Sequence, residues 1–366
     1  MNADEPADGL RDGLRDGLRD GLHGALREAL RAAGAPGADA PIEALPDAGL
    51  AHAHLRLAGT GLLARIPKQS QMDLAAQANL AYQAACFDRA AASGHTPRLH
   101  GVLAPSPSLP RGALLVEEIV GRPARLPHDL PLLARALAAI HALPVPPPAA
   151  RAPLLDPADP LALLRAEIDR QAAHLDGARL QPRSSAAIAR TRAAFAACCA
   201  RPDRPPRRLI AFDAHPGNFI IRASDGAAVL VDLEKARYSH PPLDLAHATL
   251  YTSTTWDRAS SAVLDADQVL DFYRGWLAHG GDALAWQGWL VPLRAAMWLW
   301  SVTWCAKWRV QSAAAARPDA DGEDWSGERS ESGLIAHVRD RVDDYLSPQG
   351  VERVVDELDR LAADGL

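Results

Sequence analysis

Apolar runs separated by short polar turns occupy residues 209–234, and this stretch carries the most informative local pattern of the chain. A first run, Leu-Ile-Ala-Phe, leads into Asp213, and a tight turn separates that acid from Asn218. A second run follows, the turn Ser224–Gly226 reverses it, and a third run ends on Asp232. Turn residues between short apolar runs are typical of a β-hairpin. The pattern therefore predicts a hairpin that brings two acids and an amide close together.

A similar pattern earlier in the chain predicts a small sheet with one covering helix. It indicates, in order, a strand–turn–strand unit over 52–68, a helix over 73–93, and strands over 97–102 and 113–119. The following Gly121–Pro123 is expected to be a linker between two lobes. From Leu130 onward the apolar spacing becomes that of amphipathic helices, broken only by a proline-rich loop and by the hairpin. The pattern thus predicts a mixed α and β chain with a larger helical second part.

The first 24 residues repeat Asp-Gly-Leu-Arg, with a leucine at every fourth position. A leucine stripe favours a helix, but a glycine in each repeat costs about 1 kcal/mol relative to alanine. We therefore expect a partly disordered tail over 1–35, with a firm helix only from His23 to Ala33. The remaining chain is expected to divide into an N-lobe over 40–120 and a C-lobe over 121–366.

Composition and charge narrow the function classes. A chain of 366 residues can form two lobes with a core, and its net charge of −6 argues against a general nucleic-acid binder. The four cysteines have no metal-ligand spacing, so we expect free thiols in a cytoplasmic protein. No signal peptide is recognisable, and the apolar stretch Trp289–Trp308 is too often interrupted by Pro292 and charges to span a membrane.

Tryptophans cluster late in the chain, and three of them, Trp300, Trp304 and Trp308, share one helical face. We favour a helix packed in the core as the explanation. The alternative is an aromatic wall for a substrate, which would suit a cationic one.

The residue types of the predicted hairpin indicate phosphate chemistry. Carboxylate and amide oxygens from Asp213, Asn218 and Asp232 form the hard-oxygen donor set that Mg²⁺ prefers. The glycine-bearing turn Ala58–Gly61 lets backbone N–H groups approach phosphates, although such turns are usually only turns. A cation on the return strand, Arg65 or Lys68, would give phosphate oxygens a partner.

Four sequence motifs carry a resemblance to a known family. They are Asp213-x-His-Pro-Gly-Asn218, the Val-Asp232-x-Glu234 that follows it, Pro241-Pro-Leu-Asp244-Leu-Ala, and the helix segment Leu137–His141. Together they resemble the aminoglycoside phosphotransferase and choline kinase family, a small-molecule branch of the protein-kinase-like fold. The resemblance implies an α+β, two-lobed fold with a small antiparallel-sheet N-lobe and a larger, mainly helical C-lobe.

The resemblance also implies roles for individual residues. Asp213 would be the catalytic base, Asn218 and Asp232 the Mg²⁺ ligands, and Asp244 a buried acid that steadies the loop. The residues implied in nucleotide binding are Gly59, Thr60, Gly61, Arg65, Glu117 and Ile119. The implied cofactors are Mg²⁺ and a phosphoryl donor, ATP or GTP, and the implied partner is a small molecule with a hydroxyl group.

Three positions depart from the family pattern. Arg65 stands where the strand residue that grips the phosphates is usually a lysine, for which arginine is a known substitute. Ala211 stands where the family usually has a loop histidine, and Phe212 is expected to fill that space. Gln83 stands where a helix acid usually pairs with the strand cation. A glutamine holds Arg65 less firmly, because charge-assisted hydrogen bonds are roughly twice as strong as neutral ones.

Two hypotheses follow. The first is a Mg²⁺-dependent phosphotransferase acting on a hydroxyl of an aminoglycoside-like, choline-like or other metabolite. An acidic cleft containing Glu234 and Asp257 would favour a cationic acceptor. The second, suggested by Ala211 and Gln83, is a kinase-like binding or regulatory protein that holds nucleotide without transferring phosphate.

Overall fold

The structure is a computed structural model, and it describes residues 21–46, 51–280, 283–286, 288–313 and 332–365. The described chain divides into two compact units. The N-terminal unit holds the described residues up to Ala84 together with Arg98–Glu118, and the C-terminal unit holds Ala85–Pro97 and the described residues from Ile119 onward. Most of the Asp-Gly-Leu-Arg repeats lie outside the described residues.

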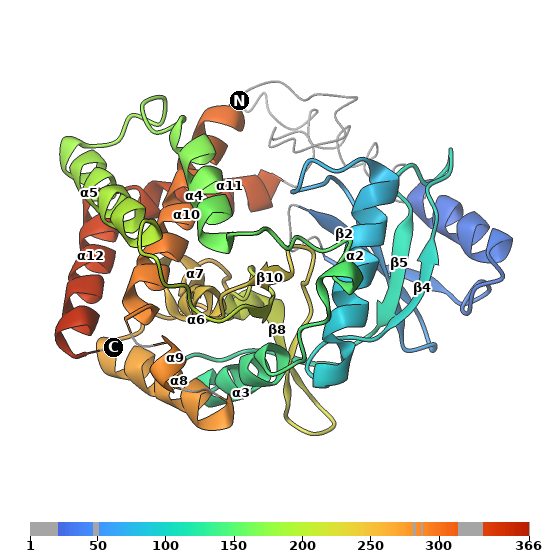
Figure 1. The fold of residues 1–366 in the computed structure, drawn as a ribbon. Coiled ribbons are helices and arrows are strands. Elements are labelled where there is room, and N and C mark those ends of the chain that lie inside the picture. Colours follow the sequence, from blue (N-terminus) through green and yellow to red (C-terminus); the bar gives the residue numbers. More distant parts are fainter. Residues whose placement is uncertain (1–20, 47–50, 281–282, 287, 314–331, 366) are drawn as a thin grey trace, which may run out of the picture. The chain divides into compact units, whose positions relative to one another are not determined.

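A five-stranded antiparallel sheet forms the centre of the N-terminal unit (Figure 1). Its strand order is β1 (Ile42–Ala44), β2 (His52–Leu57), β3 (Leu62–Pro67), β5 (Ala113–Glu117) and β4 (Leu99–Leu103). The predicted hairpin over 52–68 is therefore present as β2 and β3, which pair from His52 opposite Pro67 to Leu57 opposite Leu62.

The β2–β3 turn depends on two glycines with left-handed backbone, Gly59 at φ 76° and Gly61 at φ 71°. Other residues rarely adopt this conformation without strain. Between them the Thr60 hydroxyl donates to Leu57 O at 2.6 Å and accepts from Leu62 N at 3.1 Å. The turn is thus held by its own side chain as well as by its backbone.

A helix over 21–32 packs on this sheet and completes the core of the unit. Leu26 and Leu30 are fully buried in one cluster with Leu55 and Leu57 of β2 and Leu115 of β5. In Figure 1 this helix is the dark blue ribbon beside the sheet. The helix expected from His23 onward therefore exists, and residues 21 and 22 already belong to it. Helix α2 (Ala76–Ala90) corresponds to the helix predicted over 73–93 and is shorter at both ends.

Two small sheets in the C-terminal unit present the predicted hairpin. Strands β8 (Phe219–Arg222) and β9 (Ala228–Leu230) form it, and β7 (Arg208–Ile210) pairs instead with β10 (Arg237–Ser239). Gly121–Pro123, which we expected to be a linker, is strand β6 and pairs with β8. A Cβ at Gly121 would lie 2.2 Å from Ile221 O, so this close pairing requires glycine.

Helices make up the rest of the C-terminal unit, and α10 (Leu290–Gln311) lies at its centre. The others are α3 (Leu130–His141), α4 (Pro160–Ala172), α5 (Pro182–Cys199), α6 (Pro242–Thr249), α7 (Tyr251–Thr254), α8 (Ala266–Gly280), α9 (Ala283–Trp286), α11 (Ser332–Tyr345) and α12 (Pro348–Ala363).

Helix α10 packs against α4, α5 and α6. Its Trp298 and Trp308 are fully buried core residues, whereas Trp300 and Trp304 remain partly exposed. None of the described helices is long and apolar enough to cross a membrane.

Candidate active site

Asp213 stands just after β7, in a loop whose backbone is held by a buried carboxylate. Asp244, on α6, is fully buried, and its two oxygens accept hydrogen bonds from Ala211 N and Phe212 N, both at 2.7 Å. Charge-assisted bonds of this kind are stronger than neutral ones. Asp244 therefore fixes the two residues that directly precede Asp213, which is the steadying role that the family resemblance implied.

The Asp244 carboxylate is also hydrogen-bonded to His141 of α3. His141 Nε2 lies 3.0 Å from Asp244 Oδ2, and Trp276 Nε1 donates to His141 Nδ1 at 3.0 Å. Because Nδ1 accepts that bond, the proton of a neutral imidazole sits on Nε2 and is donated to Asp244. A continuous chain of hydrogen bonds thus runs from α8 through α3 and α6 to the loop.

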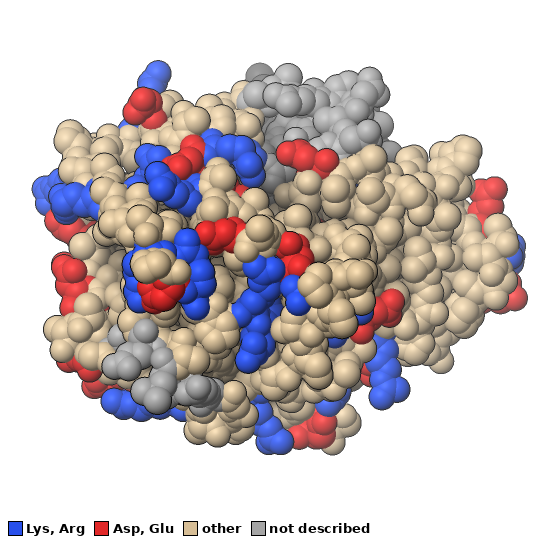
Figure 2. Space-filling model, viewed as in Figure 1, with Lys and Arg blue, Asp and Glu red and all other residues tan. Residues whose placement is uncertain are grey.

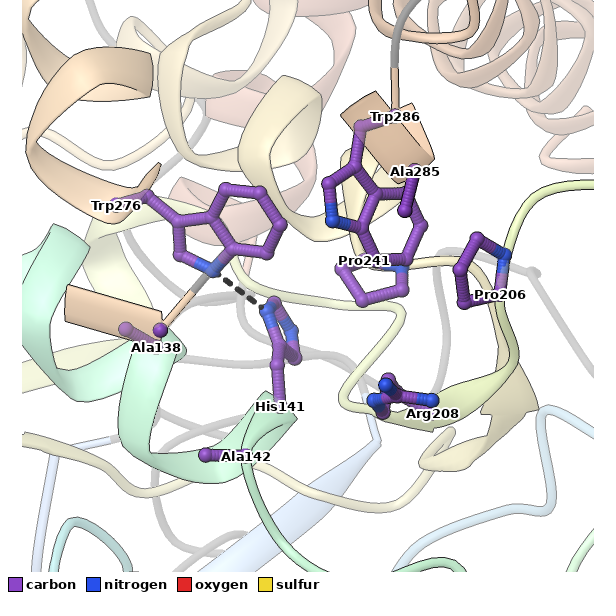
Figure 3. Close-up of a pocket in the computed structure, with 10 residues that line it drawn as sticks. Ala138, His141, Ala142, Pro206, Arg208, Pro241, Trp276, Ala285 and Trp286 are labelled. Atoms are coloured by element: carbon purple, nitrogen blue, oxygen red, sulfur yellow. Dashed lines mark hydrogen bonds between the residues drawn. The ribbon is translucent and has the colours of Figure 1, made fainter. Parts of the chain in front are cut away.

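A pocket of about 170 Å³ lies beside this chain of hydrogen bonds (Figure 3). Its walls include His141, Arg208, Pro241, Trp276 and Trp286. Figure 3 shows the Trp276 ring nitrogen directed at His141 within it. Neither the candidate base nor the candidate metal ligands line this pocket.

Phe212 occupies an unusual position immediately before Asp213. Its φ of 64° lies in the left-handed region, which is strained for a bulky residue and is found most often at functional sites. The ring is buried, meets Trp300 edge-on at 5.3 Å between centroids, and lies 3.8 Å from the guanidinium carbon of Arg237. Phe212 thus fills its surroundings as expected, and packing on both sides of the ring holds the strained backbone.

Asp213 forms a buried ion pair that the sequence did not predict. Lys235 Nζ lies 2.7 Å from Asp213 Oδ2, and His247 Nδ1 lies 3.6 Å from Asp213 Oδ1. The side chains of Lys235 and Asp213 are only 9% and 15% exposed, so water screens their attraction little. Lys235 also lies over the Trp300 ring, 5.3 Å from its centroid.

These contacts decide the charge states in the site. Burial raises the pKa of Asp213, but Lys235 and the imidazoles of His247 and His215 outweigh it, and the net pKa is lowered. Burial lowers the pKa of Lys235, but Asp213 and Glu234 outweigh it, and the net pKa is raised. Burial also lowers the pKa of His247 to about 4. At neutral pH the site therefore holds an ionised acid, a charged lysine and a neutral imidazole.

The two candidate metal ligands are tied to the same loop. Asn218 lies in the 3₁₀ turn η3 (Pro216–Asn218), and its Nδ2 donates to Asp213 O at 2.8 Å. Val231 N donates to Asn218 O at 2.9 Å, which fixes the residue next to Asp232. Since the amide nitrogen of Asn218 is engaged, its oxygen is the atom that it can offer to a cation. An amide oxygen and a carboxylate fit Mg²⁺, which takes few ligands from protein.

The candidate nucleotide residues lie mostly in the N-terminal unit. Gly59, Thr60 and Gly61 form the β2–β3 turn, and Arg65 is buried on β3. Arg65 Nη2 lies 3.2 Å from His52 Nδ1, and His52 Nε2 lies 3.0 Å from Gln83 Oε1.

We expected Gln83 to meet Arg65 directly, and His52 stands between them instead. Arg65 donates to Nδ1, so a neutral His52 donates from Nε2 to the glutamine. Gln83 therefore contacts Arg65 through the imidazole of His52. The position of Gln83 on a predicted helix could not have indicated this intermediate residue.

Glu117 ends β5, and Ile119 follows it as the first residue of the C-terminal unit. Glu117 N donates to Arg98 O at 2.8 Å, and Glu117 Oε2 accepts from Arg98 N at 3.2 Å. The side chain of Glu118 pairs with Arg56 at 2.6 Å. The carboxylates of Glu117 and Glu118 are thus both engaged within the N-terminal unit.

Lys235 and His247 are the residues of this site that sequence reasoning missed. Lys235 directly follows the Asp232-x-Glu234 motif, and His247 follows Asp244 by three residues on α6. Their positions next to known motif residues were the available signal. Only the folded chain shows that both side chains approach the carboxylate of Asp213.

Lys and Arg atoms are interspersed with Asp and Glu atoms on the face of the molecule shown in Figure 2. Charges of both signs are thus mixed on this face.

Solved structures resemble this chain in fold. A choline/ethanolamine kinase family protein from Mesorhizobium loti has a TM-score of 0.53 at 19% identity, covering 92% of this chain and 99% of its own. A spectinomycin phosphotransferase in complex with ADP and spectinomycin has a TM-score of 0.56 at 11% identity, and the match covers 87% of this chain and 93% of that one. The GDP complex of an aminoglycoside 2'-phosphotransferase has a TM-score of 0.51 at 15% identity, and the match covers 84% of this chain and 92% of that one. These likenesses confirm the predicted protein-kinase-like fold.

Comparison with curated proteins by sequence finds no match. Comparison with protein families matches residues 47–279 to the family described as the phosphotransferase enzyme family. The match covers more than half of the chain and includes every motif that carried the resemblance. The chain therefore belongs to the phosphotransferase enzyme family, whose members are small-molecule kinases.

Proposed function

We propose that this chain moves the γ-phosphoryl group of a nucleotide to a hydroxyl group of a small molecule, with Asp213 as the base and Mg²⁺ as cofactor. The observation that carries the proposal is the Asp213 loop. Asp244 fixes the loop backbone, and Asn218 is bonded to the carbonyl of the candidate base. Such positioning is most of what phosphoryl transfer requires of a protein.

Asp213 would accept the proton of the acceptor hydroxyl as the oxygen attacks phosphorus. Its lowered pKa keeps it ionised at neutral pH and ready to accept a hydrogen bond from a hydroxyl. Positioned proton acceptors of this kind contribute about 10²–10⁴ in rate.

Asn218 and Asp232 would hold Mg²⁺, which when bound neutralises phosphate charge. The Gly59–Gly61 turn and Arg65 would bind phosphate oxygens, and the backbone around Glu117 and Ile119 would bind the base. The ADP and GDP bound in two structures of similar fold support a nucleotide donor and leave ATP and GTP as the two candidates.

The test is nucleotide consumption by the purified chain with Mg²⁺ and either ATP or GTP, against a panel of alcohols. Turnover is expected with at least one alcohol, and Asp213→Asn is expected to abolish most of it. Asp225→Asn is the matched control, because Asp225 lies in the β8–β9 turn with its side chain 50% exposed. Asp232→Asn is expected to weaken Mg²⁺-dependent nucleotide binding.

The same experiment tests the rival hypothesis of a binding protein without transferase activity. Nucleotide binding that depends on Mg²⁺, with no consumption across the panel, would favour that rival. The intact bracing by Asp244 argues against it, because the loop keeps its backbone contacts although Ala211 replaces the usual histidine.

A further inference from the structure

The aromatic rings beside Asp213 already hold cations of the protein itself. Lys235 lies over Trp300, and the guanidinium of Arg237 lies over Phe212 at 3.8 Å from its centroid. Arg237 also forms an ion pair with Glu167 at 2.8 Å, so it is fixed in place. Since cation–π binding uses the ring face, these two rings are occupied by internal partners. The internal cation over Trp300 disfavours the wall for a cationic acceptor that the tryptophan pattern suggested.

The Asp213 carboxylate has a cationic partner as well. Lys235 Nζ lies 2.7 Å from Oδ2 in a pair that is shielded from water. A cationic amine placed near Asp213 would stand beside this ammonium group, and like charges repel strongly where water is largely excluded. The charge of Lys235 thus disfavours an amine at the position where the acceptor hydroxyl must lie.

The loop is also flanked by an imidazole and by further acids. Burial lowers the pKa of His247 to about 4, so its imidazole is uncharged at neutral pH. Two acids, Glu234 and the candidate metal ligand Asp232, lie close enough to raise the pKa of Lys235.

A third acid, Asp257, packs against Gly217. Its Oδ1 accepts from Ala259 N, Ser260 N and Ser260 Oγ within its own turn.

Helix α7 packs against η3 and adds buried hydroxyl groups. Thr252, Ser253 and Thr254 are more than nine-tenths buried, and their side-chain oxygens make no hydrogen bond within the described part of the chain. Buried hydroxyl groups without hydrogen-bond partners are uncommon, and they indicate that a partner such as a ligand is missing. These groups can donate to oxygen atoms, as an anionic or hydroxylated ligand requires.

We propose that the acceptor is a hydroxy compound that carries an anionic group, and not a cationic amine. This inference rests on the proposed function and names the substrate class for it. The carboxylate or phosphate of the acceptor binds the Lys235 ammonium, and the neighbouring hydroxyl takes the place of that ammonium at Asp213 Oδ2.

The transfer step then balances. The hydroxyl proton passes to Asp213, and the hydroxyl oxygen forms a bond to the γ-phosphorus. The bond from that phosphorus to the bridging oxygen breaks, and the nucleoside diphosphate leaves with its electron pair. Lys235 stays protonated throughout this step, because it only exchanges one anionic partner for another.

Two matched series of probes test the charge preference. One is glycerate, glycerol and 3-amino-1,2-propanediol; the other is gluconate, sorbitol and glucamine. Glycerol 3-phosphate is a further probe, which distinguishes binding of a phosphate group from binding of a carboxylate. Binding to the full chain in the presence of Mg²⁺ and a non-hydrolysable nucleotide is measured by calorimetry, and nucleotide consumption is measured in parallel.

The anionic member of at least one series is expected to bind about tenfold or more tightly than its amine, since hydrogen bonds to charged groups are the stronger ones. Lys235→Gln is expected to abolish this preference and Lys235→Arg to retain it. Lys307→Gln, on the same helix as Trp300, is the control and should leave it unchanged. Circular dichroism checks that each variant folds.

Amines that bind as tightly as the anions, anions that do not bind, or a preference that survives in Lys235→Gln would each overturn the inference. Asp213-dependent consumption of nucleotide with an amine acceptor would overturn it while leaving the proposed function standing. Anion binding that needs Lys235, without consumption of any nucleotide, would support the recognition and contradict the transferase activity.

Discussion

The ion pair of Asp213 and Lys235 sets the pH range in which the candidate base is ionised. The lowered pKa of Asp213 means that its stabilisation is present above the ordinary value of 3.8 and is lost as pH falls through the folded value below that. The raised pKa of Lys235 means that its stabilisation is present below 10.5 and is lost as pH rises through the folded value above that. Between these limits the pair contributes a constant free energy.

A buried histidine gives the chain a predictable loss of stability in acid. His240 donates from Nδ1 to Pro206 O at 3.0 Å, and burial lowers its pKa from 6.5 to about 4. Because the unfolded chain takes up this proton first, the free energy of unfolding falls as pH drops from about 6.5 to 4. The loss is about 3 kcal/mol, at roughly 1.4 kcal/mol per pH unit.

His240→Asn is expected to reduce that slope by about one proton in urea unfolding measured at pH 4.5, 5.5 and 6.5. His279→Asn, at an exposed position of α8, is the control and should keep the full slope. An unchanged slope in His240→Asn would show that this imidazole is not buried in its neutral form.

At the scale of elements, α6 and the loop after β7 form one unit through Asp244. The carboxylate receives two backbone N–H groups and the imidazole N–H of His141, so removing it leaves three buried donors unpaired. Unpaired buried donors are costly, and breaking a buried charged network commonly costs about 3–5 kcal/mol.

Asp244→Ala is therefore expected to lower the free energy of unfolding by about that amount and to abolish turnover. Thermal and urea unfolding check the first expectation, and nucleotide consumption at a permissive temperature checks the second. Asp271→Ala removes a largely exposed acid of α8 and should change stability by less than about 0.5 kcal/mol. Full activity in Asp244→Ala would contradict the bracing role.

The elements whose signals are local could be predicted from the sequence. The β8–β9 hairpin follows from Ser224–Gly226 between two apolar runs, and the β2–β3 turn follows from its two glycines. Strand β6 could not be predicted, because its three residues, Gly121–Pro123, carry no strand pattern and pair with a strand about 100 residues later.

The same distinction explains which site residues were predicted. Asp213, Asn218 and Asp232 stand at turns with recognisable spacing, and the structure ties the first two together. Lys235 and His52 depend on side chains that meet across the fold, and a lone lysine or histidine gives no sign of its partner in the sequence. The contact of Lys235 with the Trp300 ring likewise became visible only in the folded chain.

At the scale of the whole molecule, the N-terminal unit depends on a helix outside its sheet. Leu26 and Leu30, from the helix over 21–32, are completely buried in the same cluster as the strands. Deleting the side chain of a buried leucine removes transfer energy and leaves a cavity. The helix is thus part of the folded core and not an appendage of the repeats before it.

Leu30→Ala is expected to destabilise the N-terminal unit by about 2–5 kcal/mol, seen as an earlier unfolding transition in calorimetry. Val263→Ala, at a site that is 55% exposed, should leave the transition within about 0.5 kcal/mol. A Leu30→Ala variant as stable as the parent chain would show that the helix does not contribute to the core.

The central claim is that Asp213 directs transfer of a phosphoryl group to a hydroxyl. The most direct measurement follows the label from γ-³²P-labelled ATP or GTP into a small-molecule product, with Mg²⁺ and the alcohol panel, in wild type, Asp213→Asn and Asp225→Asn. The account predicts a labelled phosphate ester in wild type and Asp225→Asn, and a loss of about 10²–10⁴ in its rate in Asp213→Asn. Label that never leaves the nucleotide, or a labelled ester that forms equally fast in Asp213→Asn, would contradict it.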